Sequence, residues 1–381
     1  MMFNRSFQKS VAKGLVAGAT ALLLLSQTGA AQQLRLTPGT PPAHPGHTPL
    51  YTVFQAQLPE LTEGRMRGVI LGTEVANIGN MRTAIRSGLS DVGMFLPAYF
   101  PSDLPNVNLV GDLSFMGTNS QAMGAAMTEY IVNCADCQAE LKRLGVVYTT
   151  SHASDTYQIL TTKPIRNVED LRGLRLRVGG PHYARWAEAM GAVGANVSVG
   201  ETFEAISQGV LDGTIASSAD MISFRLDDVV THVSTLRLGT YHSTISHAVG
   251  NNTWARLSAN DRRAIAEAST LASAMSTQRW AHEMAGAAEA GARTKGIEFI
   301  EPSAALVAAS DAFKARDLDS IVGRAEGRDG LTNVAAKMAE FERLVDKWTA
   351  FAESVDNDPE KMAEQINREV WANVDFTRYG L

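Results

Sequence analysis

Cysteine is scarce in this sequence. Cys134 and Cys137, three positions apart, are the only two in 381 residues. A zinc site would need two further ligands at suitable spacing, and the sequence offers none nearby. A thioredoxin-like redox centre would place such a pair directly after a strand and at a helix start, whereas this pair lies inside a predicted helix, 121–144. We therefore expect a local, structural disulfide in an oxidising compartment.

The sequence also lacks the signatures of common enzymes. It contains no Gly-x-Ser-x-Gly elbow, no His-Glu-x-x-His motif, no phosphate loop and no dinucleotide fingerprint. The pairs His44/His47 and His242/His247 have no Asp, Glu or Cys at metal-ligand spacing, which favours loop-forming or packing histidines. These absences predict a protein that is not an enzyme and has no cofactor and no metal ligands.

Long apolar runs are missing after the first thirty-odd residues. There, Arg5, Lys9 and Lys13 precede an uncharged run, 15–25, and small residues follow it up to Ala31. This order is typical of an export signal, and the run is too short to span a bilayer. We predict cleavage near Ala31 and a periplasmic mature protein that does not span the membrane.

The charge is acidic. The formal net charge is -6, and loss of the three signal cations would take it to -9, because residues 1–31 contain no Asp or Glu. An acidic surface argues against nucleic acid as a partner. The length and the 45% of hydrophobic residues are sufficient for two domains, each with its own core.

One sequence unit occurs twice, at 84–95 and 205–216, with Ala, Ile, Gly and Asp matching in register. In each copy the Gly is expected to end a helix in a left-handed conformation, and the Asp to open a short strand. Each copy follows a strand and a helix: 66–71 with 77–87, and 196–199 with 201–208. Further strands are expected at 34–36, 157–161 and 174–178. This alternation predicts two α/β lobes with parallel sheets, whose ligands bind beyond the carboxyl ends of the strands.

The later sequence is helical and rich in alanine. A capping-box-like start at Ser258 opens a stretch that runs to about Ala292 without proline. At about 1.5 Å per residue, such a helix is longer than one small lobe is wide, so we expect it to cross both lobes. Helices at 333–354 and 359–370 follow, and we interpret the aromatic residues of this tail, Trp348, Phe351 and Trp371, as packing groups.

The segment 167–181 contains an anion-binding pattern. A strand ends beside Arg177, Gly179 and Gly180 follow it, and Pro181 stands where a helix would begin. Guanidinium, exposed backbone amides and a helix N-terminus together suit a carboxylate. From spacing alone, a solvated arginine is an equally weighted alternative.

Several segments in order resemble the substrate-binding proteins of tripartite ATP-independent periplasmic (TRAP) transporters, the DctP family. The resemblance rests on 163–178, 190–192, 200–206, 209–213 and 252–258. It implies a two-lobed, type II-like periplasmic-binding-protein fold of the α/β class, with crossing strands and a long helix between the lobes. It also implies membrane permease subunits as partners, a small organic anion as ligand, and a carboxylate-pairing role for Arg177. Ligands of this family include C4-dicarboxylates, 2-oxo acids, sugar acids and sialic acid.

Other pocket positions are carried over less cleanly. Counted from Arg177, pocket contacts of the sialic-acid-binding relatives fall on Tyr157, Val199 and Ala216, and in the first repeat near Phe95 and Leu96. The polar and aromatic contacts of those relatives are mostly replaced, which suggests a smaller, less polar organic acid than sialic acid. By their position, Tyr241 and His242 are candidates for the pocket wall, with packing as the alternative, and so are His182 and Tyr183.

These inferences divide the chain into five parts. We expect a signal peptide at 1–31, the first part of lobe I at 32–155, the first part of lobe II at 156–242, the return to lobe I with the start of the spanning helix at 243–282, and the completion of lobe II with C-terminal helices at 283–381. The predicted function is capture of a small organic acid for a TRAP permease. One alternative is a secreted α/β enzyme with His182, Tyr241 or His242 as acid-base groups, and another is a thiol-redox protein.

Overall fold

The computed structural model describes residues 31–327 and 329–381. The predicted signal peptide, 1–31, lies outside the described residues except for Ala31. Within the described ranges, no helix combines the length and the apolar character that a bilayer crossing requires.

The first lobe is built on a five-stranded sheet in the order β2-β1-β3-β10-β4. Its strands are β1 (Gln32–Thr37), β2 (Met66–Ile70), β3 (Val92–Phe95), β4 (Val146–Val147) and β10 (Ile245–Gly250). The first three are parallel, and β10 runs antiparallel to β3 and β4. The helices of this lobe are α1 (Leu50–Leu61), α2 (Met81–Arg86), α3 (Pro105–Gly111), α4 (Ser120–Asn133), α5 (Ala135–Leu144) and α9 (Asn251–Ala255).

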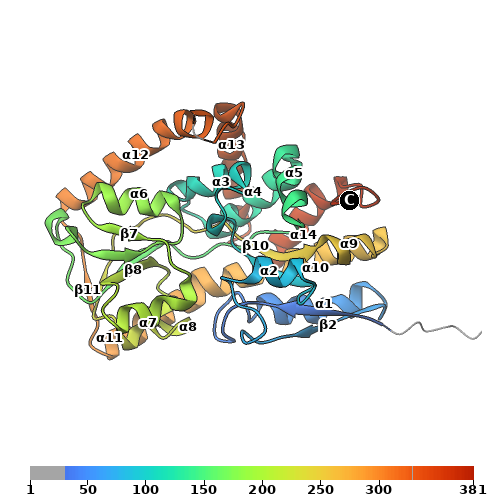
Figure 1. Ribbon diagram of the computed structural model, residues 1–381, viewed down its shortest axis with the longest axis horizontal. Coiled ribbons are helices and arrows are strands. Elements are labelled where there is room, and N and C mark those ends of the chain that lie inside the picture. Colours follow the sequence, from blue (N-terminus) through green and yellow to red (C-terminus); the bar gives the residue numbers. More distant parts are fainter. Residues whose placement is uncertain (1–30, 328) are drawn as a thin grey trace, which may run out of the picture.

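The second lobe contains a six-stranded sheet in the order β11-β9-β5-β8-β6-β7. Its strands are β5 (Gln158–Thr161), β6 (Arg175–Arg177), β7 (Val193–Ala195), β8 (Gly213–Ala216), β9 (His232–Ser234) and β11 (Glu298–Ile300). The helices α6 (Pro181–Ala189), α7 (Thr202–Ser207) and α8 (Asp220–Ser223) belong to it. The two-lobed α/β class predicted from the sequence is thus confirmed (Figure 1). The prediction of parallel sheets was wrong, because both sheets are mixed: β10 is antiparallel to β3 and β4, and β5 is antiparallel to β8 and β9.

The sequence repeat has the same structural role in both lobes. Asp91 accepts hydrogen bonds from the backbone N–H and the guanidinium of Arg35 on β1, and Asp212 accepts the same pair from Arg175 on β6. The preceding glycines, Gly88 and Gly209, both have positive φ, as the left-handed helix ends require. Each Asp thereby connects a new strand to its parallel neighbour.

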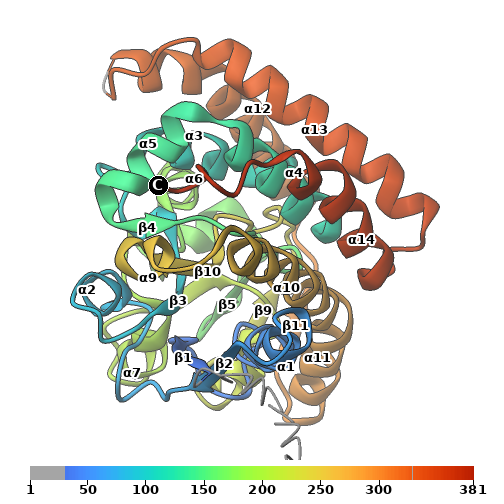
Figure 2. The same cartoon turned by 90° about the vertical axis from the view of Figure 1, so that its right-hand side faces the viewer.

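The lobes are connected by two crossing segments and one long helix. The chain passes from β4 to β5 and returns from β9 to β10, and an antiparallel bridge joins Thr156 to Thr240 where the two segments meet. The long helix comprises α10 (Ala259–Gln278), a π-helical stretch (Arg279–Met284) and α11 (Ala285–Thr294), and Figures 1 and 2 show it extending along both lobes. Ser258 caps its start by accepting a hydrogen bond from the N–H of Asp261.

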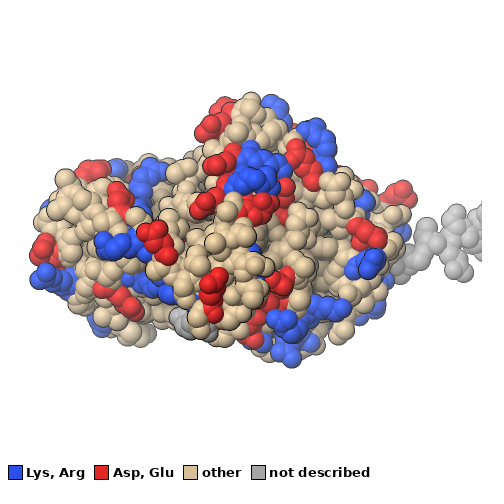
Figure 3. Space-filling model, turned by 90° about the horizontal axis from the view of Figure 1, so that it is seen from above, with Lys and Arg blue, Asp and Glu red and all other residues tan. Residues whose placement is uncertain are grey.

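Three further helices complete the chain: α12 (Ala304–Gly327), α13 (Val334–Ser354) and α14 (Pro359–Glu369). In Figure 1, α12 passes above α6 and leads toward α13, and Figure 2 shows α13 beside α4. Trp348 and Trp371 are fully buried, consistent with their interpretation as packing groups. The face seen in Figure 3 carries acidic and basic side chains interspersed, without a broad area of one sign.

Several local predictions were wrong. The predicted helix 121–144 is two helices, because Cys134 interrupts it in an extended conformation and its sulfur accepts the N–H of Cys137. The two cysteines are joined in a disulfide at the start of α5. The strand expected at 196–199 lies earlier, as β7. The sequence reasoning also missed α12.

Candidate functional site

A cavity lies between the lobes, where the chain leaves the carboxyl ends of β3, β6 and β8. Such edges are the usual ligand sites of parallel α/β sheets. About 30 Å³ of the cavity is available to the centre of a water molecule, so its walls lie close together. The lining residues are Thr40, His44, Ile78, Met94, Leu96, Tyr99, His152, Tyr157, Arg177, Gly179, Val199, Asp220, Tyr241 and Trp280.

Arg177 contributes the positive charge of this cavity. It is the last residue of β6 and is only 2% exposed. Its Nε donates to the carbonyl of Val197 (3.0 Å) and its Nη2 donates to the hydroxyl of Tyr99 (2.8 Å). A guanidinium has five N–H groups, so both hydrogens of Nη1 and one of Nη2 have no protein acceptor among the described residues. These hydrogens are arranged to bind a carboxylate.

The turn after Arg177 leaves space beside the guanidinium. A Cβ atom at Gly179 would lie 3.6 Å from the Arg177 Nη1 and 3.6 Å from the ring of Tyr157. The backbone N–H groups of Gly179 and Gly180 donate to no acceptor in the described part of the chain. Pro181 then begins α6, where its missing N–H costs nothing.

Tyr99 joins the two lobes at the cavity. It ends a 3-10 turn (Pro97–Tyr99) that follows β3 in the first lobe. Its hydroxyl oxygen accepts hydrogen bonds from Arg177 and from the backbone N–H of Val199 (3.0 Å), both in the second lobe. This one hydroxyl therefore fixes the position of the guanidinium relative to the first lobe.

Asp220 is a second ionisable group in the cavity wall. It follows β8, at the start of α8, and is 2% exposed. Burial raises the pKa of its carboxyl to about 7, although the nearby Arg177 acts in the opposite direction. The closest base is His44, whose Nε2 lies 3.8 Å from Oδ1 of Asp220.

Aromatic rings form much of the remaining wall. The rings of Tyr157 and Tyr241 are stacked, with centroids 5.5 Å apart, and Tyr183 stacks on the other side of Tyr157 at 5.3 Å. The buried hydroxyl of Tyr241 has no hydrogen-bond partner within residues 31–327 and 329–381. Trp280, from the π-helical stretch, packs edge-on against His44. The cavity therefore combines flat apolar surfaces with a few unpaired polar atoms, as small-molecule sites commonly do.

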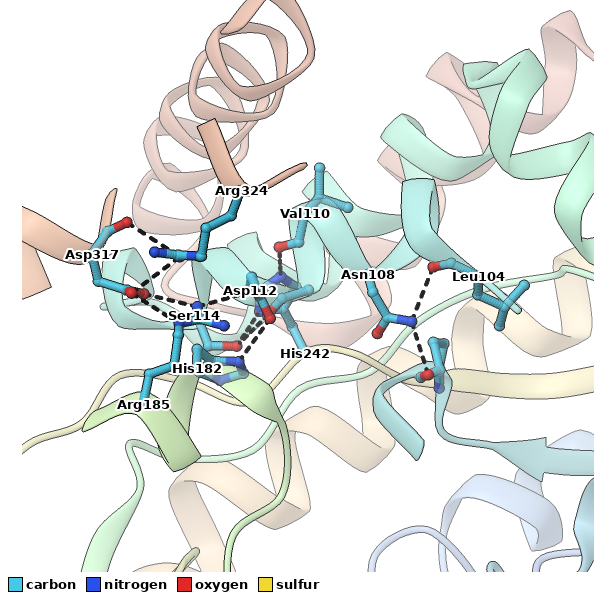
Figure 4. A network of polar contacts seen from close by, with 12 residues as sticks. Leu104, Asn108, Val110, Asp112, Ser114, His182, Arg185, His242, Asp317 and Arg324 are labelled. Atoms are coloured by element: carbon cyan, nitrogen blue, oxygen red, sulfur yellow. Dashed lines mark hydrogen bonds and ion pairs between the residues drawn. The ribbon is translucent and has the colours of Figure 1, made fainter. Parts of the chain in front are cut away.

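A second group of polar contacts connects the lobes beside α6 (Figure 4). Arg185 on α6 donates to Asp317 on α12 (2.8 Å) and to Asp112 in the first lobe (3.0 Å). His182, also on α6, lies 3.3 Å from the Asp112 carboxylate, and Arg324 pairs with Asp317 at 3.0 Å. A separate cavity of about 480 Å³ borders this network.

The structure brings six of the eleven predicted ligand-binding residues into the cavity wall: Leu96, Tyr157, Arg177, Gly179, Val199 and Tyr241. The other five, Phe95, Gly180, Pro181, Ala216 and His242, do not line it. Phe95 stacks on Phe100, with ring centroids 4.8 Å apart. The Nε2 of His242 lies 3.0 Å from the carbonyl of Val110, and burial lowers the pKa of this histidine to about 4.

Sequence reasoning missed Tyr99, Asp220 and Trp280 as wall residues. Asp220 carried a usable signal, because it lies just beyond the strand of the second repeat and parallel strands direct the residues that follow them toward the site. Tyr99 has the equivalent position after the first repeat. His44 was interpreted as a loop or packing residue, and it does pack, but its ring also lines the cavity. Among the described residues, no group of three or more His, Cys, Asp or Glu side chains is arranged to hold a metal ion.

The sequence matches the family described as "Bacterial extracellular solute-binding protein, family 7" over residues 38–318. A solute-binding protein of Chromohalobacter salexigens is 27% identical over 247 residues, which cover 63% of this chain and 70% of that protein. A solute-binding protein of Albidiferax ferrireducens is 22% identical over 189 residues, which cover 49% of this chain and 55% of the relative. The chain thus spans little more than half the length of the second relative.

Solved structures share the fold. A TRAP periplasmic solute-binding protein from Bordetella bronchiseptica with bound (R)- and (S)-mandelate has a TM-score of 0.71 and 24% identity, covering 83% of this chain and 99% of that chain. A marine metagenome TRAP protein specific for aromatic acids, in complex with 3-hydroxybenzoate, has a TM-score of 0.73 and 19% identity, with 84% and 99% covered. At such identities the likeness establishes the two-lobed fold.

Proposed function

Because the chain belongs to family 7 of the bacterial extracellular solute-binding proteins, we propose that it is the periplasmic subunit of a TRAP transporter, which captures a small organic acid and delivers it to the membrane permease. The observation that carries this proposal is Arg177, buried between the lobes with guanidinium hydrogens that have no acceptor in the described part of the protein. A charge kept in such a place needs an anionic partner. Export through a signal cleaved near Ala31 is part of the proposal.

Capture would proceed by hinge motion. The solute carboxylate would dock on Arg177 and on the free amides of Gly179 and Gly180 while the lobes are apart. Rotation about the two crossing segments would then bring Tyr99 and Leu96 of the first lobe over the solute and exclude water. Loss of water strengthens the ion pair, and the permease would recognise the closed form.

The walls favour a compact, partly apolar acid. Ile78, Met94, Leu96 and Val199 contribute apolar surface, and the tyrosine rings contribute flat faces. Candidate solutes are C4-dicarboxylates and 2-oxo or hydroxy acids. The relatives with bound mandelate and 3-hydroxybenzoate support a hydroxy acid or an aromatic acid as a candidate.

A thermal-shift screen of the mature protein tests the proposal. The panel would contain mono- and dicarboxylates, 2-oxo acids, hydroxy acids and sugar acids, because a solute that binds the native state raises its melting temperature. We expect one class of carboxylate to give a clear shift and to bind stoichiometrically without conversion. A panel in which neutral sugars stabilise the protein and no acid does would contradict the proposal. Turnover of a bound acid would instead favour the secreted-enzyme alternative, which the comparisons do not support.

A further inference from the structure

We propose that Asp220 sets the solute class, so that the pocket accepts a monocarboxylate carrying a hydrogen-bond donor, a hydroxyl or an ammonium, and discriminates against dicarboxylates. This inference rests on the proposed function, since it assumes that the solute carboxylate occupies Arg177.

The first observation is that Asp220 is buried without a donor. Its side chain lines the cavity, and neither of its carboxyl oxygens accepts a hydrogen bond from the described residues; Oδ1 is fully buried. A buried acceptor without a partner destabilises the folded protein. A solute donor that reaches this carboxyl would remove that destabilisation on binding.

His44 does not satisfy Asp220. The Nδ1 of His44 accepts the N–H of Gly46 (2.8 Å), so the neutral ring carries its proton on Nε2, the atom that faces Asp220. Burial lowers the pKa of His44 to about 3, which keeps the ring uncharged at neutral pH. At 3.8 Å this N–H is too distant for a hydrogen bond.

The second observation concerns charge. Arg177 is the only cationic side chain among the described residues that line the cavity, because both histidines of the wall are held neutral by burial. One guanidinium can neutralise one carboxylate. A second carboxylate on the solute would meet Asp220 without a second cation, so either two like charges would repel in a dry cavity or one of the two carboxyls would have to bind a proton.

Other polar atoms of the wall are also compatible with a donor-bearing solute. The hydroxyls of Thr40 and Tyr241 and the Nε2 of His152 are buried, and the described residues offer none of them a hydrogen-bond partner. Each hydroxyl can accept or donate a hydrogen bond, and the Nε2 of His152 can do one or the other according to its tautomer. A solute hydroxyl could thus bond to Asp220 and one neighbour together, whereas a plain alkyl acid would leave all of them unpaired.

A matched set of four-carbon acids provides the test. Butyrate, 4-hydroxybutyrate, 4-aminobutyrate and succinate differ only at the end distant from the first carboxylate, and benzoate, 3-hydroxybenzoate and isophthalate repeat the comparison on a ring. Affinities would be measured by calorimetry for the mature wild-type protein, for Asp220→Asn and for Glu289→Gln. Glu289→Gln is the control. It removes one carboxylate outside the cavity, where Glu289 accepts hydrogen bonds from Gln158 and Ser218.

We expect the wild type to bind a donor-bearing acid about tenfold or more tightly than the plain acid and the dicarboxylate of its scaffold. In Asp220→Asn, the ratio of the affinity for the donor-bearing acid to the affinity for the dicarboxylate should fall about tenfold. Glu289→Gln should leave this ratio unchanged. If the natural solute carries an ammonium, 4-aminobutyrate will lose the most affinity in Asp220→Asn. If the natural solute carries a hydroxyl, the hydroxy acids will lose the most affinity.

The outcomes separate the inference from the proposed function. Tightest binding of succinate or isophthalate by the wild type, or an unchanged ratio in Asp220→Asn, would overturn the role of Asp220 while leaving carboxylate capture intact. Absence of binding by all seven acids would count against both proposals. Melting curves of the two variants would establish that both are folded, which we expect for Asp220→Asn because the amide has the shape of the carboxyl and carries no buried charge.

Discussion

Replacement of Arg177 by Lys is the most direct perturbation of the site. The lysine keeps the charge but has a single nitrogen, which cannot bond to the Val197 carbonyl, the Tyr99 hydroxyl and a solute carboxylate with the geometry of the guanidinium. Bidentate pairing with the solute is lost, and the amine is drawn toward the protein acceptors. The charge alone should therefore restore only part of the affinity.

The size of the effect follows from the contacts. Hydrogen bonds to charged groups contribute about 1.5–3 kcal/mol each, and the substitution removes at least one of two such bonds to the solute while weakening the other. We expect a loss of about 3 kcal/mol, or roughly a hundredfold in Kd. Because Arg177 is almost fully buried, solvent does not screen this loss.

Titration calorimetry with the solute found in the screen would measure this change. Arg175→Lys is the matched control, because Arg175 lies two residues earlier on the same strand, is half exposed, and pairs with Asp212 away from the cavity. We expect its affinity to stay within about threefold of the wild type. An Arg177→Lys protein that is folded and binds as tightly as the Arg175→Lys protein would refute the assignment of the anion site.

Two other substitutions test the architecture around the site. Tyr99→Phe removes the hydroxyl that accepts from Arg177 and Val199, so calorimetry should show roughly tenfold weaker solute binding, and unchanged binding would argue against a bridging role. Asp155, which accepts a hydrogen bond from Ser217, has a pKa raised to about 8 by burial, so its contribution to stability is complete at acidic pH and is lost as the pH rises toward 8. Above about pH 6.5 the histidines are neutral in the unfolded state as well as in the folded state, so they no longer oppose this trend. Asp155→Asn should therefore reduce the fall in melting temperature between about pH 6.5 and 8. An equally steep fall in the variant would exclude Asp155 as the source.

Much of the framework could be predicted from local sequence. The two Gly and Asp positions of the repeat define helix ends and strand starts through contacts with near neighbours or with one adjacent strand, so their pattern is visible in the chain. Arg177 was equally accessible, since strand alternation ends beside it and a Gly-Gly-Pro turn follows. Both predictions depended on patterns that are visible in a short stretch of sequence, although the Asp contacts themselves join strands far apart in the chain.

The rest depended on contacts between distant segments. Asp220 and Tyr99 line the cavity only because the two lobes meet, and nothing near either residue in the sequence specifies the other lobe. The helix containing Cys134 looks continuous by periodicity, but the disulfide and the sulfur cap at the start of α5 interrupt it. His242 was a candidate for the pocket wall because it follows Tyr241, yet hydrogen bonding turns its ring toward the carbonyl of Val110.

The cluster in Figure 4 connects the solute cavity to the outer helices. Helix α6 begins directly after the turn beside Arg177, and on this helix Arg185 contacts both Asp112 of the first lobe and Asp317 of α12. Separation of the lobes must therefore lengthen the contact between Arg185 and Asp112, while the contact to Asp317 can persist if α12 moves with α6. Arg185 and Asp112 are only 22% and 20% exposed while the pair is formed, but both would regain water if the lobes separated, so the cost of breaking the pair would fall toward the value for an exposed pair, about 1 kcal/mol. In the proposed hinge motion, so small a bias would let solute binding, rather than this contact, decide whether the lobes close.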